Sequence, residues 1–114
     1  MNALHIIRPR IVIRSDFLIG PGKIDLLRAI ESTGSISAAA RSMAMSYKRA
    51  WSLIEELNRG LAKPVVLPAV GGRGGGGAQL TATGRALVER YDALEQECAR
   101  AARPHLHRIH RLLR

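Results

Sequence analysis

The sequence predicts a mainly α-helical fold with one small β-hairpin, and three stretches support this prediction. Residues 35–61 have the pattern of two short helices joined by a tight turn. Residues 64–81 place two apolar runs on either side of a glycine-rich segment, which is typical of a β-hairpin. Residues 83–102 repeat apolar residues at heptad spacing, which is typical of a long packed helix. Together they predict a winged helix-turn-helix with a long C-terminal dimerisation helix. The boundaries we expect are a winged unit with an N-terminal strand at residues 1–81, and a helix with a basic tail at residues 82–114.

The composition is strongly basic. The chain of 114 residues has 18 Lys and Arg against 9 Asp and Glu, a formal net charge of +9, and its pI is about 11.3. A protein with this charge is expected to bind a polyanion such as nucleic acid. No apolar run approaches the length of a membrane-spanning helix, and the start lacks the order of a signal peptide, so we expect no membrane contact and a cytoplasmic location. The single Cys98 excludes an internal disulfide.

The first elements are predicted to be a strand and a helix. Residues 8–19 are β-branched and partly alternating, with Pro9 near their start, and predict an edge strand that pairs with the later hairpin. A helix is expected from Pro21 to Ser32, because Pro suits the first turn and Gly34 suits the left-handed residue that ends a helix. Its buried stripe is expected to contain Ile24, Leu26, Leu27 and Ile30.

The helix-turn-helix begins with a short helix from Ser37 to about Met43. Its run of three alanines at 38–40 lets another helix cross closely, and the turn Ala44-Met45 is short enough to hold a steep angle. Ser46 is a suitable N-cap for a second helix that starts at Tyr47. Two ordinary core helices are the alternative interpretation of this stretch.

The second helix has a buried stripe and an exposed basic face. Three- and four-residue spacings put one set of apolar residues on a single stripe: Ala50, Leu53, Ile54, Leu57 and Leu61. Lys48, Ser52, Glu55 and Arg59 fall on the opposite side. Arg49 is expected on one flank, and Tyr47 and Trp51 on the other. Trp51 has a second interpretation, in which its indole packs against the preceding helix.

The glycine-rich segment GGRGGGG is expected to be the tip of a wing between strands at residues 64–70 and 78–81. Bare backbone can lie against a phosphate chain, while Arg73 enters the minor groove or pairs with phosphate. Gly72, Gly74 and Gly77 also fit the dinucleotide-binding pattern G-x-G-x-x-G, but that motif must open a helix, and here a strand follows. A flexible linker is the remaining alternative.

The last helix is predicted from about Thr83 to Ala102, with Thr81 or Thr83 as its cap and Arg103-Pro104 as its end. Its seam consists of Leu87, Tyr91, Leu94, Cys98 and Ala101. A second copy of the chain would supply the partner helix, so we expect a homodimer that reads two half-sites. In the alternative, the seam covers the chain's own core.

Catalysis and metal binding are not expected. The histidines at 105, 107 and 110 are spaced by two and three residues, so they do not share one helical face as residues i and i+4 would. The chain has one Cys, no convergent acid and base groups, and four histidines near its ends. We therefore predict no enzyme activity, no cofactor and no metal site. A basic tail that rests on the helix, a partner or DNA is the expected role of the C-terminus.

Two motifs resemble one known family. The run SISAAARSMAMSYKRAW and the wing GGRGGGGAQLTATG, with GPGKIDLLRAIESTG in front, are similar to the DNA-binding domain of the molybdate-responsive (ModE) regulators, over roughly residues 11–94. The helix-turn-helix is also similar to that of the LysR-type regulators. The resemblance implies a dimeric transcriptional regulator of double-stranded DNA. Family members that sense molybdate use modules after the long helix, and this chain ends at Arg114. We therefore expect no molybdate-binding module, so that the regulator acts constitutively, takes its signal from a separate effector-sensing protein, or regulates something else.

The candidate DNA-binding residues follow from these observations. Lys63, Arg73, Arg41 and the helix N-terminus at Ser46 are expected to contact phosphates, while Lys48, Arg49, Ser52 and Tyr47 meet base edges. The full candidate set is Ser35, Ser37, Arg41, Ser46, Tyr47, Lys48, Arg49, Trp51, Ser52, Lys63, Arg73, Gly74 and Gly75. A protein-interaction module and a nonspecific basic nucleic-acid-binding protein are the alternative functions.

Overall fold

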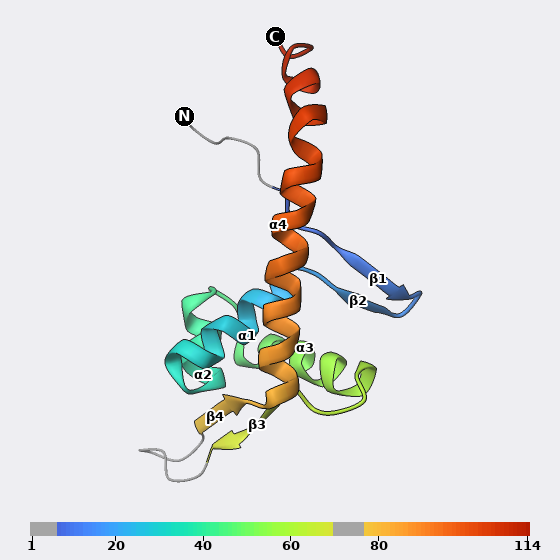
Figure 1. Ribbon diagram of the computed structural model, residues 1–114. Helices are drawn as coiled ribbons and strands as arrows, with labels where there is room; N and C mark the ends of the chain where they lie inside the picture. The colour runs from blue at the N-terminus through green and yellow to red at the C-terminus, as the bar shows by residue number, and fades with distance from the viewer. Residues whose placement is uncertain (1–6, 70–76) are drawn as a thin grey trace.

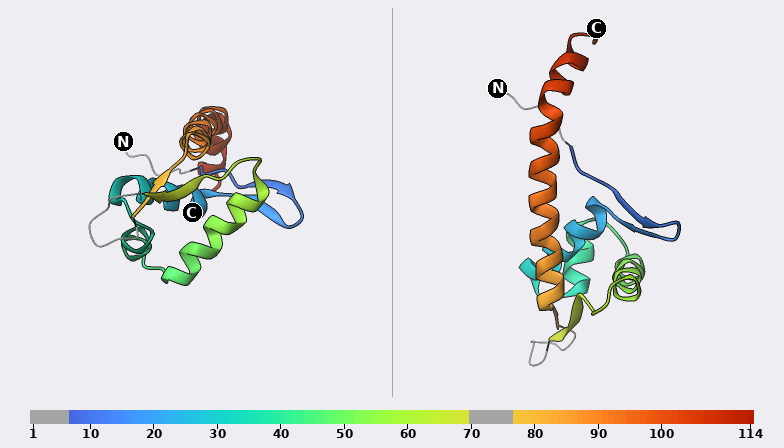
Figure 2. Two further views of the ribbon diagram at one scale, coloured as in Figure 1. Left: turned by 90° about the horizontal axis from the view of Figure 1, so that it is seen from below. Right: turned by 45° about the vertical axis from the view of Figure 1, so that its right-hand side comes forward.

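The computed structural model describes residues 7–69 and 77–114. Three helices pack together beside a two-stranded wing, and a fourth, much longer helix runs along them and continues past them (Figures 1 and 2). The elements in order are β1 (Ile11–Arg14), β2 (Phe17–Ile19), α1 (Pro21–Thr33), α2 (Ile36–Ser42), α3 (Tyr47–Gly60), β3 (Val66–Ala69), β4 (Gly77–Leu80) and α4 (Ala82–His110). The winged helix-turn-helix prediction is confirmed.

Helix α1 is the centre of the core. Pro21 stands in its first turn, and the predicted stripe, Ile24, Leu26, Leu27 and Ile30, is completely buried. Gly34 ends the helix with φ of 79°, and its N–H donates to the Ile30 carbonyl at 2.8 Å. Only glycine adopts this left-handed conformation at no steric cost, which explains why the helix ends here.

Helices α2 and α3 are each fixed by a serine cap. The Ser35 hydroxyl accepts a hydrogen bond from the Ala38 N–H at 2.9 Å, and the Ser46 hydroxyl accepts one from the Arg49 N–H at 3.0 Å. Between the helices Ala44 has a positive φ of 54°. This conformation forms the tight turn at which the chain changes direction from α2 to α3. The prediction that α3 begins at Tyr47 is confirmed, whereas α2 begins one residue earlier than predicted.

The N-terminal segment differs from the prediction. Residues 8–19 do not form one strand that joins the later hairpin, because β1 and β2 pair with each other in a separate antiparallel sheet. The polar pair Ser15-Asp16 forms the turn between them, and such residues favour turns because their side chains bond to nearby backbone. The resulting arm projects sideways from the helices (Figure 1).

The wing joins the helix-turn-helix at its base. Strands β3 and β4 pair from Val66 with Leu80 to Ala69 with Gly77. The Ala78 N–H donates to the Gly34 carbonyl at 2.9 Å, and a bridge pairs Ser35 with Gly77. The strand that leaves the wing tip is therefore tied to the turn between α1 and α2.

Helix α4 is longer than predicted. The Thr81 hydroxyl caps it by accepting from the Gly84 N–H at 3.0 Å, but its predicted end at Ala102 is wrong, because it continues through Pro104 to His110. Proline removes one hydrogen bond to the carbonyl four residues earlier. Pro104 is exposed, so water can bond to the released carbonyl of Arg100, and the helix is not forced to end.

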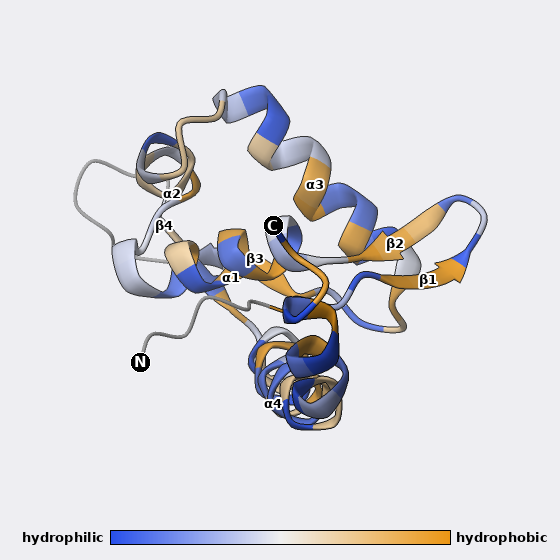
Figure 3. Ribbon diagram, turned by 90° about the horizontal axis from the view of Figure 1, so that it is seen from above, coloured by the Kyte–Doolittle hydropathy of each residue, from blue (hydrophilic) through white to orange (hydrophobic). Residues whose placement is uncertain are grey.

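Ion pairs and one hydrogen bond attach the N-terminal segment to the helices. The Arg8 guanidinium donates to Asp25 of α1 at 2.7 Å and to Glu95 of α4 at 3.0 Å. The Tyr91 hydroxyl donates to the Pro9 carbonyl at 2.6 Å. In the view along α4, α1 lies between α4 and α3, and the arm formed by β1 and β2 extends to one side (Figure 3).

Candidate nucleic-acid interface

Helix α3 presents two half-exposed aromatic rings on one flank. Tyr47 is 53% exposed and Trp51 is 39% exposed. They stand one turn apart, with ring centroids 6.3 Å apart and planes at 76°, an edge-to-face arrangement. The structure therefore favours the exposed interpretation of Trp51 over packing against α2.

The opposite side of α3 is fixed in the core, which determines the direction of the exposed face. Ala50, Leu53, Ile54 and Leu57 are buried, as predicted, and Leu61 packs partly against the core. Apolar and hydrophilic residues alternate along this helix in Figure 3. Rotation of the helix would expose the apolar stripe, so the outward direction of Lys48 and Ser52 is determined by packing.

The N-terminus of α3 lies among exposed cations and hydroxyls. Ser46, Lys48 and Arg49 are exposed, and Arg41 of α2 donates to the Ser37 hydroxyl at 3.0 Å. The unpaired amides of a helix N-terminus and its partial positive charge favour an anion such as phosphate. Among the described residues, neither Lys48 nor Arg49 forms an ion pair with an acidic side chain, so their charge is available to a ligand.

The other predicted residues lie at the base of the wing or outside the described part. Ser35 is half-buried where α2 meets β4, and Lys63 is exposed in the segment between α3 and β3. Arg73, Gly74 and Gly75 lie outside the described residues. The structure thus brings the α2 and α3 residues and Ser35 to one end of the molecule.

Two cations that sequence reasoning did not select lie beside this face. A groove of about 430 Å³ has Arg10, Lys23 and Arg49 in its lining. Lys23 is almost buried, and its ammonium donates to the Leu18 carbonyl at 2.6 Å and pairs with Glu56 of α3 at 3.0 Å. Lys23 lies four residues before Leu27, so it falls on the apolar stripe of α1. This spacing in the sequence could have predicted that Lys23 is buried. Lys23 therefore positions α3 relative to α1 and β2.

The predicted seam of α4 divides into two parts. Tyr91 is almost fully buried and Leu87 packs partly against the core, so both belong to the interior of this chain. Leu94 is 37% exposed, Cys98 is half-buried, and Ala101 is exposed. The upper part of the helix is thus the part that a second chain can reach.

The end of α4 and the residues that follow it are basic. Residues 98–114 contain five arginines and no acidic residue. Within residues 7–69 and 77–114 no group of three or more His, Cys, Asp or Glu is arranged to hold a metal ion. None of the helices in those ranges is both long and apolar enough to cross a membrane.

Comparison with known proteins agrees with this architecture. The chain is 47% identical over 87 residues to the molybdenum-pterin-binding protein MopB of Rhodobacter capsulatus, covering 76% of this chain and 32% of that protein. It is 46% identical over 76 residues to the DNA-binding transcriptional dual regulator ModE of Escherichia coli K12, covering 67% and 29%. The chain therefore spans about a third of the length of these curated relatives.

A solved structure has the same fold. The DNA-binding domain of CbnR, in a crystal structure of its complex with DNA, matches with a TM-score of 0.61 at 18% identity, covering 77% of this chain and 95% of that one. Residues 22–85 match the family model for bacterial regulatory helix-turn-helix proteins of the lysR family, and its span extends from α1 through the wing into α4. This match covers more than half of the chain, so the chain belongs to the lysR family of bacterial regulatory helix-turn-helix proteins.

Proposed function

We propose that this chain is a sequence-specific regulator of transcription that binds double-stranded DNA as a homodimer. The observation that carries the proposal is the exposed face of α3, where a capped helix N-terminus, unpaired cations and two aromatic rings lie together on a rigid, core-packed helix. The names of the relatives point in the same direction, because one is a DNA-binding transcriptional dual regulator.

In the proposed docking, α3 lies in the major groove with its N-terminal half toward the bases. Lys48 and Ser52, in the middle of the exposed face, donate to base edges, and Arg49 and Tyr47 contact bases from the flanks. Phosphates on either side are bound by Arg41, by Lys63 and by the amides at Ser46. Ser35 and Ser37 add hydroxyl donors where α2 meets the wing.

In this proposal residues 1–81 bind DNA and residues 82–114 form the dimer contact. The exposed upper seam of α4, formed by Leu94, Cys98 and Ala101, supports this division because it has no covering element in the described chain. Two copies would present two α3 helices, which suits half-sites about one helical turn, or ~34 Å, apart.

The proposal is tested by measuring binding of the purified chain to the intergenic DNA upstream of its own gene, against random duplex, at physiological salt. We expect the affinity ratio to reach about 10³ or more, the lower range for specific regulators. The measurement is repeated with molybdate, because the name of one relative refers to molybdenum. Equal affinity for both duplexes would contradict the proposal and favour a protein-interaction or nonspecific role.

A further inference from the structure

We infer that Tyr47 and Trp51 form a preorganised apolar edge that recognises the C5-methyl groups of thymine in the major groove. This inference rests on the proposed function. It specifies the chemical feature of the DNA that one flank of α3 recognises.

The two rings are held by each other rather than by the core. Tyr47 is the first residue of α3 and Trp51 follows four residues later, so both side chains stand on one side of the helix. The edge-to-face contact at 6.3 Å fixes their relative orientation before any ligand arrives. Because both rings remain 53% and 39% exposed, a further partner can cover apolar surface that water now contacts.

The position of the rings along the helix matches base recognition. The N-terminal residues of a recognition helix approach base edges most closely, and the pair occupies the first and fifth positions of α3. The thymine methyl is the apolar group that unmodified DNA exposes in the major groove. An apolar flank next to the donors Lys48 and Ser52 therefore fits a sequence in which thymine lies beside an acceptor-rich base.

The ring geometry argues against stacking on unpaired bases. Single-strand binders use aromatic faces as successive platforms. Here the interplanar angle of 76° turns one ring edge toward the other ring, which leaves no parallel pair of faces. No hydrogen bond within the described residues uses the Tyr47 hydroxyl or the Trp51 indole N–H, so neither ring is held by a polar contact in the chain.

The experiment starts from a random duplex pool, from which the full chain selects its own preferred sequence. Each thymine of the selected duplex is then replaced singly by deoxyuridine, which removes the C5-methyl alone. At the recognised thymine, we expect affinity to fall by roughly fourfold for each methyl removed, which corresponds to the free energy of burying one methyl group. When the thymine is replaced in both half-sites, affinity should fall by roughly sixteenfold.

Protein variants assign that effect to the pair. The ratio compared is the affinity for the thymine duplex divided by the affinity for the deoxyuridine duplex. In Trp51→Ala this ratio should fall to near one, whereas Tyr47→Phe should keep the wild-type ratio because the ring edge remains. Glu55→Ala, also exposed on α3, is the matched control and should keep the wild-type ratio. Because deoxyuridine changes only the DNA, the wild-type measurement stands even if a variant folds poorly.

Three outcomes would overturn the inference while leaving the proposed function intact. They are a selected duplex without thymine, a selected duplex whose affinity is unchanged at every deoxyuridine, and tighter binding to the single strand of the same sequence. A pool that yields no enriched sequence would instead contradict the proposed function itself.

Discussion

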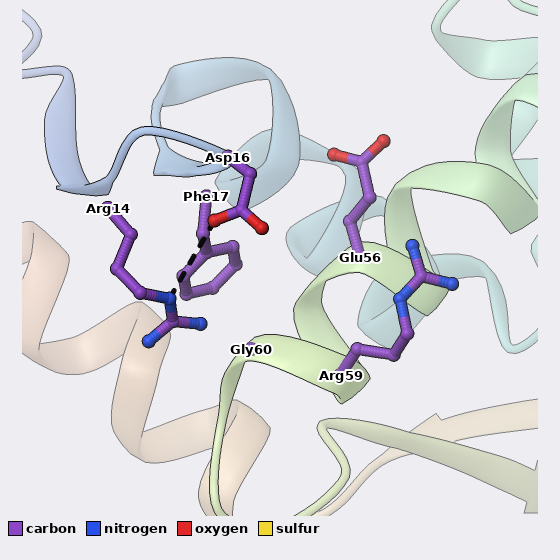
Figure 4. A pocket seen from close by; sticks show the side chains of 6 residues that line it. All are labelled: Arg14, Asp16, Phe17, Glu56, Arg59 and Gly60. Carbon is purple, nitrogen blue, oxygen red and sulfur yellow. Dashed lines mark ion pairs between the residues drawn. The ribbon is translucent and has the colours of Figure 1, made fainter.

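The ring of Phe17 lies directly against the backbone of Gly60, at the last residue of α3. A Cβ atom built on Gly60 would lie 2.5 Å from the Cε1 and Cε2 atoms of that ring. The Lys23 ammonium and the Arg14 guanidinium lie 5.2 and 5.3 Å from the ring centroid, which is within the range of cation–π attraction. In Figure 4 the ring stands between the arm and the end of α3. This contact holds the C-terminal end of the proposed recognition helix against the N-terminal arm.

Gly60→Ala is expected to destabilise the protein by about 1–3 kcal/mol, the usual cost of overpacking, because the added methyl overlaps a buried ring. Urea denaturation followed by circular dichroism measures the change. Gly22→Ala is the control, since a Cβ there meets nothing within 4 Å. Equal midpoints for both variants would show that the Phe17 ring moves aside easily.

Asp25 should make stability depend on pH at the acid end. The Arg8 guanidinium that donates to its carboxylate lowers the pKa of Asp25 below its ordinary value of 3.8. The stabilisation is therefore present above the unfolded-state pKa and is lost as the pH falls through the lower folded-state value. At pH 7 Asp25→Asn is expected to cost about 0.5–1 kcal/mol, since the pair is partly exposed.

The difference between wild type and Asp25→Asn should close as the pH falls below about 4. Thermal unfolding midpoints between pH 7 and pH 3 measure it. Asp16→Asn, whose side chain is 85% exposed, is the control and should leave the midpoint at pH 7 unchanged. A gap that stays constant down to pH 3 would mean that the contribution of Asp25 to stability does not depend on the charge of its carboxylate.

Lys48→Ala should weaken binding to the preferred duplex and relax its sequence preference. If Lys48 donates to a base edge, its loss should cost about 1–3 kcal/mol on that sequence and much less on random DNA. Arg59→Ala, exposed in the last turn of the same helix, is the matched control and should change both affinities little. Fluorescence anisotropy with both duplexes measures the ratio, and an unchanged ratio in Lys48→Ala would reject this docking.

Salt titration should reveal which cations contact phosphate. Binding should weaken linearly on a double logarithmic plot against salt, with a slope of about −0.9 for each phosphate neutralised. Because the proposed homodimer carries two copies of Lys63, Lys63→Ala is expected to reduce the magnitude of that slope by about two and to weaken all sequences equally. The same titration on Lys63→Arg, which keeps the charge, should retain the wild-type slope. A Lys63→Ala slope equal to wild type would remove Lys63 from the contact set.

Pro104→Ala should stabilise the upper part of α4. Alanine restores the N–H that can bond the Arg100 carbonyl, and it is about 3 kcal/mol more favourable than proline within a helix. Hydrogen exchange of the amides of residues 105–110, which both proteins carry, should therefore slow. His105→Ala, a neighbouring exposed position, restores no such bond and should change exchange little. Unchanged exchange in Pro104→Ala would mean that proline does not limit this segment.

Local chemistry made most of the elements predictable. The caps at Ser46 and Thr81, the left-handed Gly34 and the three- and four-residue spacings of α1 and α3 depend on neighbours in the chain, so they can be read without a tertiary structure. The same spacings determine which side of α3 is buried, and therefore which candidate residues are exposed.

Contacts between distant segments decided the rest. Whether Tyr91 faces a second chain or Pro9 depends on a partner far away in sequence. The pairing of β1 is local, because β2 follows directly after the Ser15-Asp16 turn, whereas the prediction joined this segment to the distant wing. The end of α4 depends on whether the carbonyl that Pro104 releases reaches water. The sequence by itself determined the order of the four helices, the Ser46 cap and the exposed basic face of α3. The tertiary structure decided the burial of Tyr91 and the positioning of α3 by Phe17 and Lys23, because each requires a surface that exists only after packing.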